Sequence, residues 1–563
     1  MRTRLWTLGL ALGLAVVACG GDKSTGPGDP EPTISTVFPA IGTVGTELTI
    51  TGANFRAGAT VFVGAIAATE VEVSSGTTIY ARVPSGLSVG IAYAVRVHNS
   101  DGSEVQLAAA FTAVAPSLRF VNGATLPSGS IGSTVILEGD AFGDLQGGGS
   151  VLFSDGAGGT IAATIVDPSN DWTNTFIVTT VPSGTATGNV VVTTGTGSSN
   201  ALTFTVSTAA TFSPSTIAWT SSTALPAVLS GHKASFAVRG GANLVYVTGG
   251  AGNDSVPTTG VQFAAIEPAG GVGAWSATTA LPTARAFHAL AVATPHNSRV
   301  LADSASIYVL GGAIDVVGTP STTVYRGRLN TDGTVSSWVT TTPLPVALHS
   351  LGAVIFRGEI YISGGATAAN APVTGVYRAR IDSTGALGAW QALPSLPSAR
   401  AQHGFVVFGR FLYTVGGSRA AVNPHSASLT DARTDEVLYA AINLRTGELA
   451  QTAWTVNANA LTKTTAKQGV VAAGGTIFMN GGLYSAANTG SSENSYAVFN
   501  SDGSVGAFAG ATGSNTIVSS GGGNLFNHAV LSYVDATGVS RVLVLGGDDV
   551  SAPSTKRSAV WFY

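Results

Sequence analysis

Short runs in which apolar and small polar residues alternate fill most of this 563-residue chain. Val71 and Val73, or Val95 and Val97, stand two positions apart, as side chains on one face of a β-strand do. Glu, Lys, Gln and Met, which favour helices, are scarce, and Gly, Pro, Asn and Asp separate the runs at short intervals. This pattern predicts an all-β protein.

The second half of the chain repeats one unit six times. In each unit an apolar run such as LVYVTGG or SIYVLGG ends in a Gly-Gly pair, and in most units an aromatic pair follows at nearly constant spacing. The six pairs begin at Gly249, Gly311, Gly364, Gly416, Gly481 and Gly546. Units of about 50 residues made of short strands predict a β-propeller, and six units predict six blades.

Residues 212–563 resemble Kelch repeats, on the Gly-Gly pairs, a His near the start of each unit and a Trp on its last strand. The resemblance implies a propeller fold and no particular activity. Only one more strand, Ser558 to Tyr563, follows the last Gly-Gly pair, whereas Thr216 to Trp219 reads as a last strand with no unit of its own. We therefore expect residues 216–220 to complete the sixth blade beside 559–563.

Two segments before the repeat are expected to form small β-sandwiches. Residues 32–114 resemble the IPT/TIG family of immunoglobulin-like domains, on the motifs TGANF at Thr51 and VPSG at Val83. Residues 115–207 carry related motifs in the same order, EGDAF at Glu138 and VPSG at Val181. The resemblance implies spacer modules or modules that contact a protein or glycan.

The predicted fold class is therefore all-β, with two immunoglobulin-like β-sandwiches followed by a six-bladed Kelch-like β-propeller that an N-terminal strand closes. Asn330 to Gly333 and two similar segments also resemble the Asp-box of sialidases. Asp-Gly between two strands is at the same time a standard hairpin signal, and we interpret these segments as turns.

The start of the chain is predicted to be a targeting segment. Arg2 and Arg4 precede an apolar stretch that is too short to span a bilayer as a finished helix. The sequence Val16-Val17-Ala18-Cys19 then resembles the lipobox of bacterial lipoproteins. This resemblance implies that residues 1–18 are a cleaved signal peptide and that Cys19 is lipidated. The alternative is an ordinary secretory signal in which this Cys stands by chance.

A lipidated Cys19 implies a protein of the bacterial cell envelope that is held at a membrane by its lipid. Gly20 after this Cys is compatible with sorting to the outer membrane of Gram-negative bacteria, facing the periplasm or the surface. Residues 19–31, rich in Gly, Pro and Asp, are expected to form a flexible tether. Cys19 is the only cysteine, so we expect neither disulfides nor thiol catalysis.

The charge pattern argues against nucleic acid as a partner, because the formal net charge is -4 and the Arg residues form no basic run. The partners we expect are the membrane, through the lipid, and a glycan or protein ligand. The combination of propeller and immunoglobulin-like domain is also similar to galactose oxidase. That family builds a copper cofactor from a Cys cross-linked to a Tyr, and here no Cys exists outside the lipobox. We expect no cofactor.

Histidines are the first candidates for chemistry, since they start equivalent strands of different units. The series, completed by Gln468 in the same register, is His232, His288, His349, His403 and His528. Spread around a six-fold ring, these side chains would lie too far apart for tetrahedral ligation, so no metal is expected. The Kelch resemblance implies that such a His forms local hydrogen bonds.

Two arginines are the second candidates. Arg285 and Arg400 stand three residues before His288 and His403. Either they tie neighbouring blades together, or these four side chains line one mouth of the channel and hold an anionic ligand such as a sugar carboxylate. We assign no catalytic residue, because the chain has no Gly-x-Ser-x-Gly elbow, no HExxH and no P-loop.

The favoured hypothesis is a non-enzymatic, membrane-anchored extracytoplasmic binding protein. The long loops Ala251–Gly260, Ala313–Pro320 and Ser418–Asp435 would carry its specificity. The alternative is a carbohydrate-active enzyme of the sialic-acid mutarotase type, because some bacterial six-bladed Kelch proteins have that activity. It would require Arg285 or Arg400 within reach of a buried Glu in a closed polar pocket. A purely structural envelope component is the third hypothesis.

Overall fold

The computed structural model describes the chain from residue 30 onward, except residues 122–126, 130, 166, 169–170, 207–212, 295–304, 422, 427–431, 445, 485–488, 491–493, 501, 511–524, 536–538 and 550–551. The predicted signal peptide, Cys19 and most of the predicted tether therefore lie outside the described residues. Strands and short 3-10 turns make up the secondary structure of the described part, which contains no α-helix. No helix among these residues has the length and apolar character needed to cross a membrane.

The chain divides into two compact units. The first comprises residues up to 40, 48–82 and 92–111, and the second comprises residues 41–47, 83–91 and 112–563. Most of the first sandwich lies in the first unit. The second unit contains the remaining strands of the chain, including the whole propeller.

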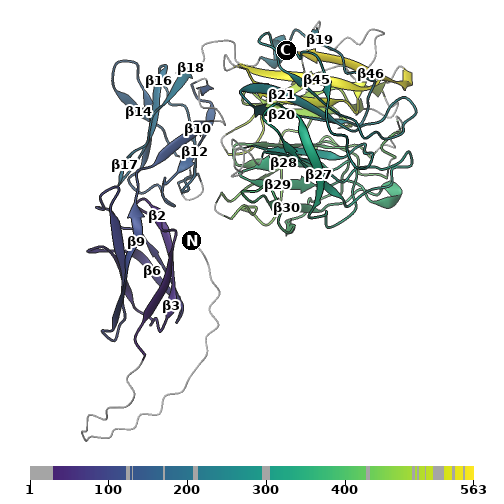
Figure 1. Ribbon diagram of the computed structural model, residues 1–563. Coiled ribbons are helices and arrows are strands. Elements are labelled where there is room, and N and C mark those ends of the chain that lie inside the picture. Colours follow the sequence, from purple (N-terminus) through teal and green to yellow (C-terminus); the bar gives the residue numbers. More distant parts are fainter. Residues whose placement is uncertain are drawn as a thin grey trace, which may run out of the picture. The chain divides into compact units, whose positions relative to one another are not determined.

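The first sandwich consists of two antiparallel sheets (Figure 1). One has the order β1 (Thr33–Phe38), β3 (Glu47–Ala53), β7 (Thr78–Arg82), β6 (Thr69–Ser75). The other has the order β2 (Ile41–Gly42), β9 (Glu104–Ala113), β8 (Ala92–His98), β4 (Thr60–Val63), β5 (Ile66–Ala67), in which only β2 and β9 are parallel. Leu48 and Ile50 are completely buried, and so are Val95 and Val97, as the alternation predicts.

Residues 117–206 form a second pair of sheets. The orders are β10 (Ser117–Val121), β12 (Thr134–Asp140), β15 (Phe176–Thr180), and β11 (Ser128–Gly129), β18 (Leu202–Val206), β16 (Gly188–Thr194), β13 (Ser150–Ser154), β14 (Thr160–Ala162), with β17 (Gly197–Ser198) beside β16.

One crowded turn is common to both sandwiches. A Cβ on Gly52 would lie 1.8 Å from the carbonyl oxygen of Thr33, and a Cβ on Gly139 would lie 1.9 Å from that of Ser117. Only glycine fits such a contact. The residue with positive φ that follows is Asn54 in the first copy and Ala141 in the second. The tight turn therefore does not require an Asx side chain.

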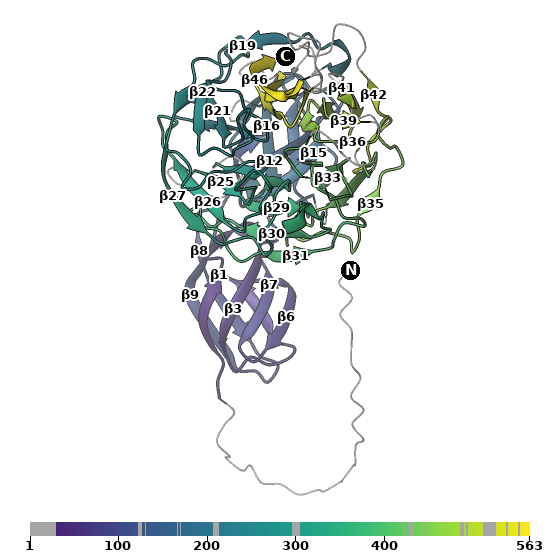
Figure 2. The same ribbon diagram turned by 90° about the vertical axis from the view of Figure 1, so that its right-hand side faces the viewer.

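Five four-stranded sheets and one five-stranded sheet form the propeller, and they follow one another around a circle in chain order (Figure 2). The additional strand of the sixth blade, β43 (Leu525–Phe526), pairs with the end of β45. From the inside outward the blades are β20 (Lys233–Arg239), β21 (Ala242–Thr248), β22 (Val261–Ala265), β23 (Ser276–Ala277); β24 (Ala289–Ala293), β25 (Ser306–Leu310), β26 (Val324–Leu329), β27 (Val335–Thr341); β28 (Gly352–Phe356), β29 (Glu359–Ser363), β30 (Val376–Arg380), β31 (Gln391–Leu393); β32 (Gly404–Phe408), β33 (Phe411–Val415), β34 (Val437–Ala441), β35 (Thr455–Val456); β37 (Gly469–Ala473), β38 (Thr476–Asn480), β41 (Asn494–Val498), β42 (Ala509–Gly510); and β44 (Ala529–Val534), β45 (Ser540–Asp549), β46 (Ala552–Phe562), β19 (Thr220–Ser222).

The outer strand of the sixth blade comes from the segment before the first blade, which confirms the predicted closure. Strand β19 pairs with β46, with Ser221 opposite Trp561. The strand begins at Thr220 rather than at residue 216, because Pro214–Thr216 form a 3-10 turn. Trp219 and Trp561 pack in one hydrophobic cluster.

A closed ring of backbone hydrogen bonds surrounds the propeller axis at the end where the innermost strands begin. The N–H of each ring residue donates to the carbonyl oxygen of its counterpart in the preceding blade, over 2.7–3.1 Å. Gly231 donates to Asn527 and thereby joins the first blade to the last. The ring residues, all with positive φ, are Gly231, Phe287, Ser350, Gln402, Lys467 and Asn527.

The Gly-Gly pairs lie against this ring. Gly249 and Gly250 have φ of 55° and 94°, a conformation that other residues rarely adopt. A Cβ on Gly250 would lie 2.7 Å from the Cβ of His232. Left-handed backbone and close approach therefore explain why both glycines recur in every blade.

Buried tyrosines on the second strand of several blades connect those blades to the next one. The hydroxyl of Tyr246 donates to the carbonyl oxygen of Gly333 over 2.8 Å, that of Tyr308 to Gly385 over 2.6 Å, and that of Tyr361 to Gly447 over 2.7 Å. The acceptors lie in the turns between the third and fourth strands. The turns at Gly333 and Gly385 are predicted hairpins, and in the first the Asp332 carboxylate accepts bonds from the backbone and hydroxyl of Thr334.

Candidate functional site

Two of the recurrent histidines form hydrogen bonds to the neighbouring blade, whereas the ring nitrogens of His232 and His528 have no hydrogen-bond partner among the described residues. His288 Nε2 lies 2.8 Å from the hydroxyl of Thr248, and His403 Nε2 lies 2.8 Å from that of Ser363. In the fifth blade Gln468 replaces His and donates to the carbonyl oxygen of Val415 over 2.8 Å. Burial lowers the pKa of His403 to about 3, so its ring is neutral near pH 7. The hydrogen-bonding role implied by the Kelch resemblance matches these contacts.

His349 does not belong to this series, and its predicted register is wrong. In the other blades the His or Gln directly follows the ring residue. In this blade the ring residue is Ser350, so Leu351 holds the equivalent position and His349 precedes the ring. Leu351 faces a strand that ends in Leu310, where the strands that face His288 and His403 end in Thr248 and Ser363, so an apolar pair replaces the hydrogen bond. His349 instead contacts Ser350 and Asn370, each over 3.0 Å.

Arg285 and Arg400 occupy ring-flanking positions that hold Leu229, Leu348 and Leu525 in three other blades. Both are buried, at 2% and 0% exposure. Arg285 donates to the hydroxyl of Ser321 over 3.2 Å, and its guanidinium lies 5.4 Å from the centre of the Tyr325 ring.

Arg400 donates to Glu436 over 3.0 Å, and Arg419 contacts the same carboxylate oxygen. The two arginines hold the pKa of the Glu436 carboxyl below its usual value, against the desolvation that raises it. The Glu436 side chain is 32% exposed. The contact is thus an ion pair at the edge of the blade.

The structure brings the four candidate residues together only in pairs. Arg285 lies near His288 in the second blade and Arg400 near His403 in the fourth, with the third blade between them. All four are buried. Anion binding by these residues stays a prediction. Within the described part of the chain, no three His, Cys, Asp or Glu side chains gather as a metal site requires.

The loops between the second and third strands of the blades, which we call the rim loops, leave the propeller at the end that carries the ring. The rim loops of the first two blades expose four aliphatic side chains. These are Val256, Ile314, Val316 and Val317, with 48%, 40%, 45% and 63% exposure. Both loops are predicted to carry specificity, and exposed aliphatic groups on neighbouring loops are typical of a contact surface.

The third predicted loop, that of the fourth blade, lies against its neighbours. Asn423 donates to the carbonyl oxygens of Val316 and Val317, each over 3.4 Å. The His425 ring contacts that of Phe287 edge-on, with centroids 4.8 Å apart. These contacts reach from the fourth blade to the second.

Lys467, a ring residue, forms hydrogen bonds to the same loop. Its ammonium donates to the carbonyl oxygens of Pro424 and Ser426 over 2.8 and 2.5 Å, and the side chain is buried. Burial lowers the pKa of Lys467 to about 7, although the Asp548 carboxylate opposes this change. The described part of the loop therefore rests on an amine that titrates near neutral pH.

At the opposite end of the innermost strands, the second sandwich contacts the propeller. Arg410 Nε lies 3.1 Å from the Asp171 carboxylate, and Arg357 donates to the hydroxyl of Thr173 over 3.3 Å. Val178 and Ile136 pack in one cluster with propeller residues. Ion pairs and apolar contacts thus hold β12 and β15 against this end.

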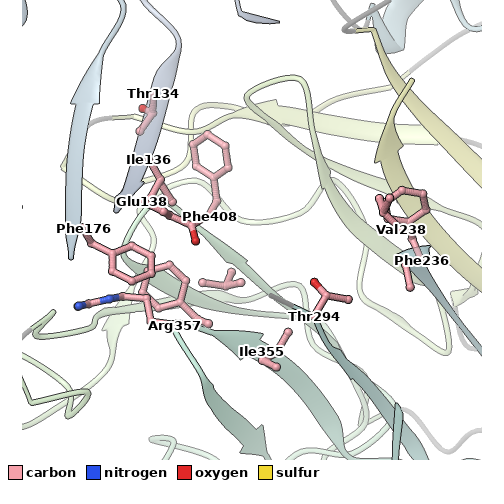
Figure 3. Close-up of a pocket in the computed structure, with 14 residues that line it drawn as sticks. Thr134, Ile136, Glu138, Phe176, Phe236, Val238, Thr294, Ile355, Arg357 and Phe408 are labelled. Atoms are coloured by element: carbon pink, nitrogen blue, oxygen red, sulfur yellow. The ribbon is translucent and has the colours of Figure 1, made fainter. Parts of the chain in front are cut away.

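A cavity of about 410 Å³ lies between these strands and the propeller (Figure 3). Phe236, Ile355 and Phe408 form much of its wall on the propeller side, and Ile136 and Phe176 form the sandwich side. The volume falls in the range of small-molecule pockets, which are lined mostly by apolar side chains with a few polar groups.

Glu138 on β12 brings the one carboxyl group to this cavity. Its side chain has no hydrogen bond or ion pair with any residue that the structure describes, although its backbone pairs with β10 and β15 in the sheet. Burial raises the pKa of Glu138 to about 8, although Arg119 and Arg357 oppose the shift. In Figure 3 the Arg357 guanidinium points away from the Glu138 carboxyl, and it lies 4.2 Å from the centre of the Phe176 ring. The acid is therefore largely protonated at pH 7.

Sequence reasoning missed Glu138. The residue continues the alternation of Thr134 and Ile136 along a strand, and a charged residue at such a position indicates a solvent-facing side. Nothing local reveals that another domain covers this face.

Residues 32–113 match the IPT/TIG domain, which confirms the predicted nature of the first sandwich, whereas the nature of the second stays a prediction. A search of the curated proteins found no match. Among solved structures, one titled "Structure of YjhT" matches with 14% sequence identity and a TM-score of 0.43, over 60% of this chain and 95% of that chain.

Proposed function

We propose that this chain is an extracytoplasmic binding protein, held at a membrane by a lipid on Cys19, whose propeller presents its rim loops to a protein or glycan ligand. The IPT/TIG domain and the second sandwich act as spacers between the membrane and the propeller. No step of this proposal requires chemistry in the propeller.

The observation that carries the proposal is the set of exposed side chains Val256, Ile314, Val316 and Val317. Aliphatic groups at 40–63% exposure on two neighbouring loops lose contact with water when a partner covers them. A protein surface provides the apolar area for this burial, so a protein partner is favoured over a glycan.

Matched valine variants test the proposal. The rim variant carries Val256→Thr, Val316→Thr and Val317→Thr, and the control carries Val498→Thr and Val534→Thr, which are 57% and 51% exposed at the other ends of their blades. The immobilised full chain is cross-linked to envelope proteins and is also applied to a glycan array. Ligands retained by the wild type and the control but lost by the rim variant support the proposal. Equal capture by all three proteins contradicts it.

A carbohydrate-active enzyme of the sialic-acid mutarotase type is the second candidate, because Arg400 contacts Glu436. The contact supplies the Arg and the Glu of that hypothesis, but the Glu436 side chain is 32% exposed rather than buried in a closed pocket. Its test is the rate at which the full chain interconverts the anomers of sialic acid, followed by NMR, with Glu436→Gln as the comparison. Acceleration that Glu436→Gln abolishes favours the enzyme. A rate equal to that in buffer removes this candidate.

A further inference from the structure

The carboxyl group of Glu138 lies at the cavity shown in Figure 3, at the opposite end of the propeller from the rim loops. The Glu138 side chain is partly buried, and a carboxyl group that has lost part of its contact with water gains stability from a hydrogen-bond partner. Here none of the described residues takes that role. The group faces a space of about 410 Å³ whose walls come mainly from phenylalanine and aliphatic side chains.

The charges around this carboxyl group narrow the choice of ligand. Arg119 on β10 and Arg357 in the propeller are the charged groups that act on it, and both favour its ionised form. Burial outweighs them and raises the pKa to about 8. At neutral pH the group is therefore a hydrogen-bond donor without charge, and the complementary ligand atom is a neutral acceptor.

We propose that this cavity binds an uncharged, mostly apolar small molecule whose single carbonyl or ether oxygen accepts the hydrogen bond of the Glu138 carboxyl group. The phenylalanine rings and Ile136 contact the apolar body of the ligand, and the oxygen is placed at β12. This site is independent of the rim loops and of the ligand they bind.

Benzophenone and 1,1-diphenylethylene are the probes, because they differ essentially in a carbonyl oxygen against a methylene group. Binding to the full chain is measured by calorimetry at pH 6.5. The ketone is expected to bind about tenfold more tightly than the alkene, as one additional hydrogen bond to a buried donor predicts. Photoactivated benzophenone should label peptides that contain residues 134–138, 236–238 or 407–409.

Two substitutions and a pH series separate this role from a structural one. Glu138→Gln keeps a donor that cannot ionise, so the preference for the ketone should persist from pH 6.5 to 9.5. In the wild type the preference should fall as the pH rises through about 8, because the carboxylate cannot donate. Glu138→Leu should bind both probes equally.

Three results would overturn the proposal. One is equal binding of ketone and alkene by the wild type, and another is photolabelling outside the named peptides. The third is tighter binding of 1-phenylethylamine than of benzophenone together with an increase as the pH rises, since this would identify a site for cations. If Glu138→Leu fails to fold, the pH series on wild type and Glu138→Gln still decides.

Discussion

Removal of a single hydroxyl group should destabilise the propeller at one tyrosine and not at another. Tyr308 and Tyr413 are both completely buried and hold the same position on the second strand of their blades. The Tyr308 hydroxyl donates to the carbonyl oxygen of Gly385 in the next blade over 2.6 Å, whereas the Tyr413 hydroxyl has no hydrogen-bond partner among the described residues. The two positions therefore form a natural control pair.

The expected magnitudes follow from this difference. Tyr308→Phe leaves the carbonyl oxygen of Gly385, itself buried, without its donor, which costs about 1–3 kcal/mol of unfolding free energy. Tyr413→Phe removes a polar group that lost its water on folding and gained no bond. Its effect should be neutral or stabilising by up to about 1 kcal/mol. The ring volume is the same in both variants.

Urea unfolding followed by tryptophan fluorescence measures the stability of both variants, because the tryptophans between residues 219 and 561 report on the propeller. The midpoint for Tyr308→Phe should fall and that for Tyr413→Phe should not, at unchanged slope. Equal losses in the two variants would refute the reasoning, because ring packing rather than the hydrogen bond would then join the blades.

Three further predictions concern pH, an ion pair and the N-terminus. His403→Gln introduces the residue found at the equivalent position 468 of the fifth blade and should reduce the loss of stability between pH 6.5 and 4.5 by about 2 kcal/mol. The reason is that folding holds the pKa of this His at about 3, while the unfolded chain takes up a proton below the ordinary pKa of about 6.5. If the stability of the variant, measured in urea titrations at several pH values, falls with pH as steeply as that of the wild type, the prediction is wrong. Glu436→Ala should lower the unfolding free energy by about 2 kcal/mol, because the buried Arg400 loses its counter-ion. Arg400→Leu should lower it by less than about 1 kcal/mol, because Arg419 still pairs with Glu436 and other blades hold Leu at this position. Thermal unfolding that shows the reverse order would contradict this account of the ion pair. Cys19→Ser should move the chain from the membrane to the soluble fraction, and retention in the membrane would disprove the lipid anchor.

The regular features of the propeller can be predicted from the sequence because each blade repeats the same local requirement. Gly249 and Gly250 recur since both need left-handed backbone, and the segment around Trp219 is recognisable as a strand without a blade. The predicted register of His349 is wrong because its blade replaces a His–Ser contact by Leu351 and Leu310. A spacing pattern cannot detect such an exchange between polar and apolar pairs.

The features that depend on distant contacts cannot be predicted in this way. A tyrosine stands in each LVY, SIY or EIY run, but its acceptor lies in another blade, 77 residues away for Tyr308. Glu138 alternates along its strand like a surface residue, and its burial comes from a domain that begins far along the chain. Burial by a neighbouring domain leaves no periodic signal in one strand.

The hydrogen bond from Gly231 to Asn527 also constrains the order in which the propeller is made. The first ring donor waits for an acceptor almost 300 residues downstream, and the edge of β19 waits for Trp561 in the last strand of the sixth blade. During synthesis the early blades therefore emerge with an unpaired strand that no later blade except the last can cover. Such an edge is prone to pair with other chains. Assembly should accordingly depend on holding the nascent chain apart from its neighbours until the final strand has been delivered.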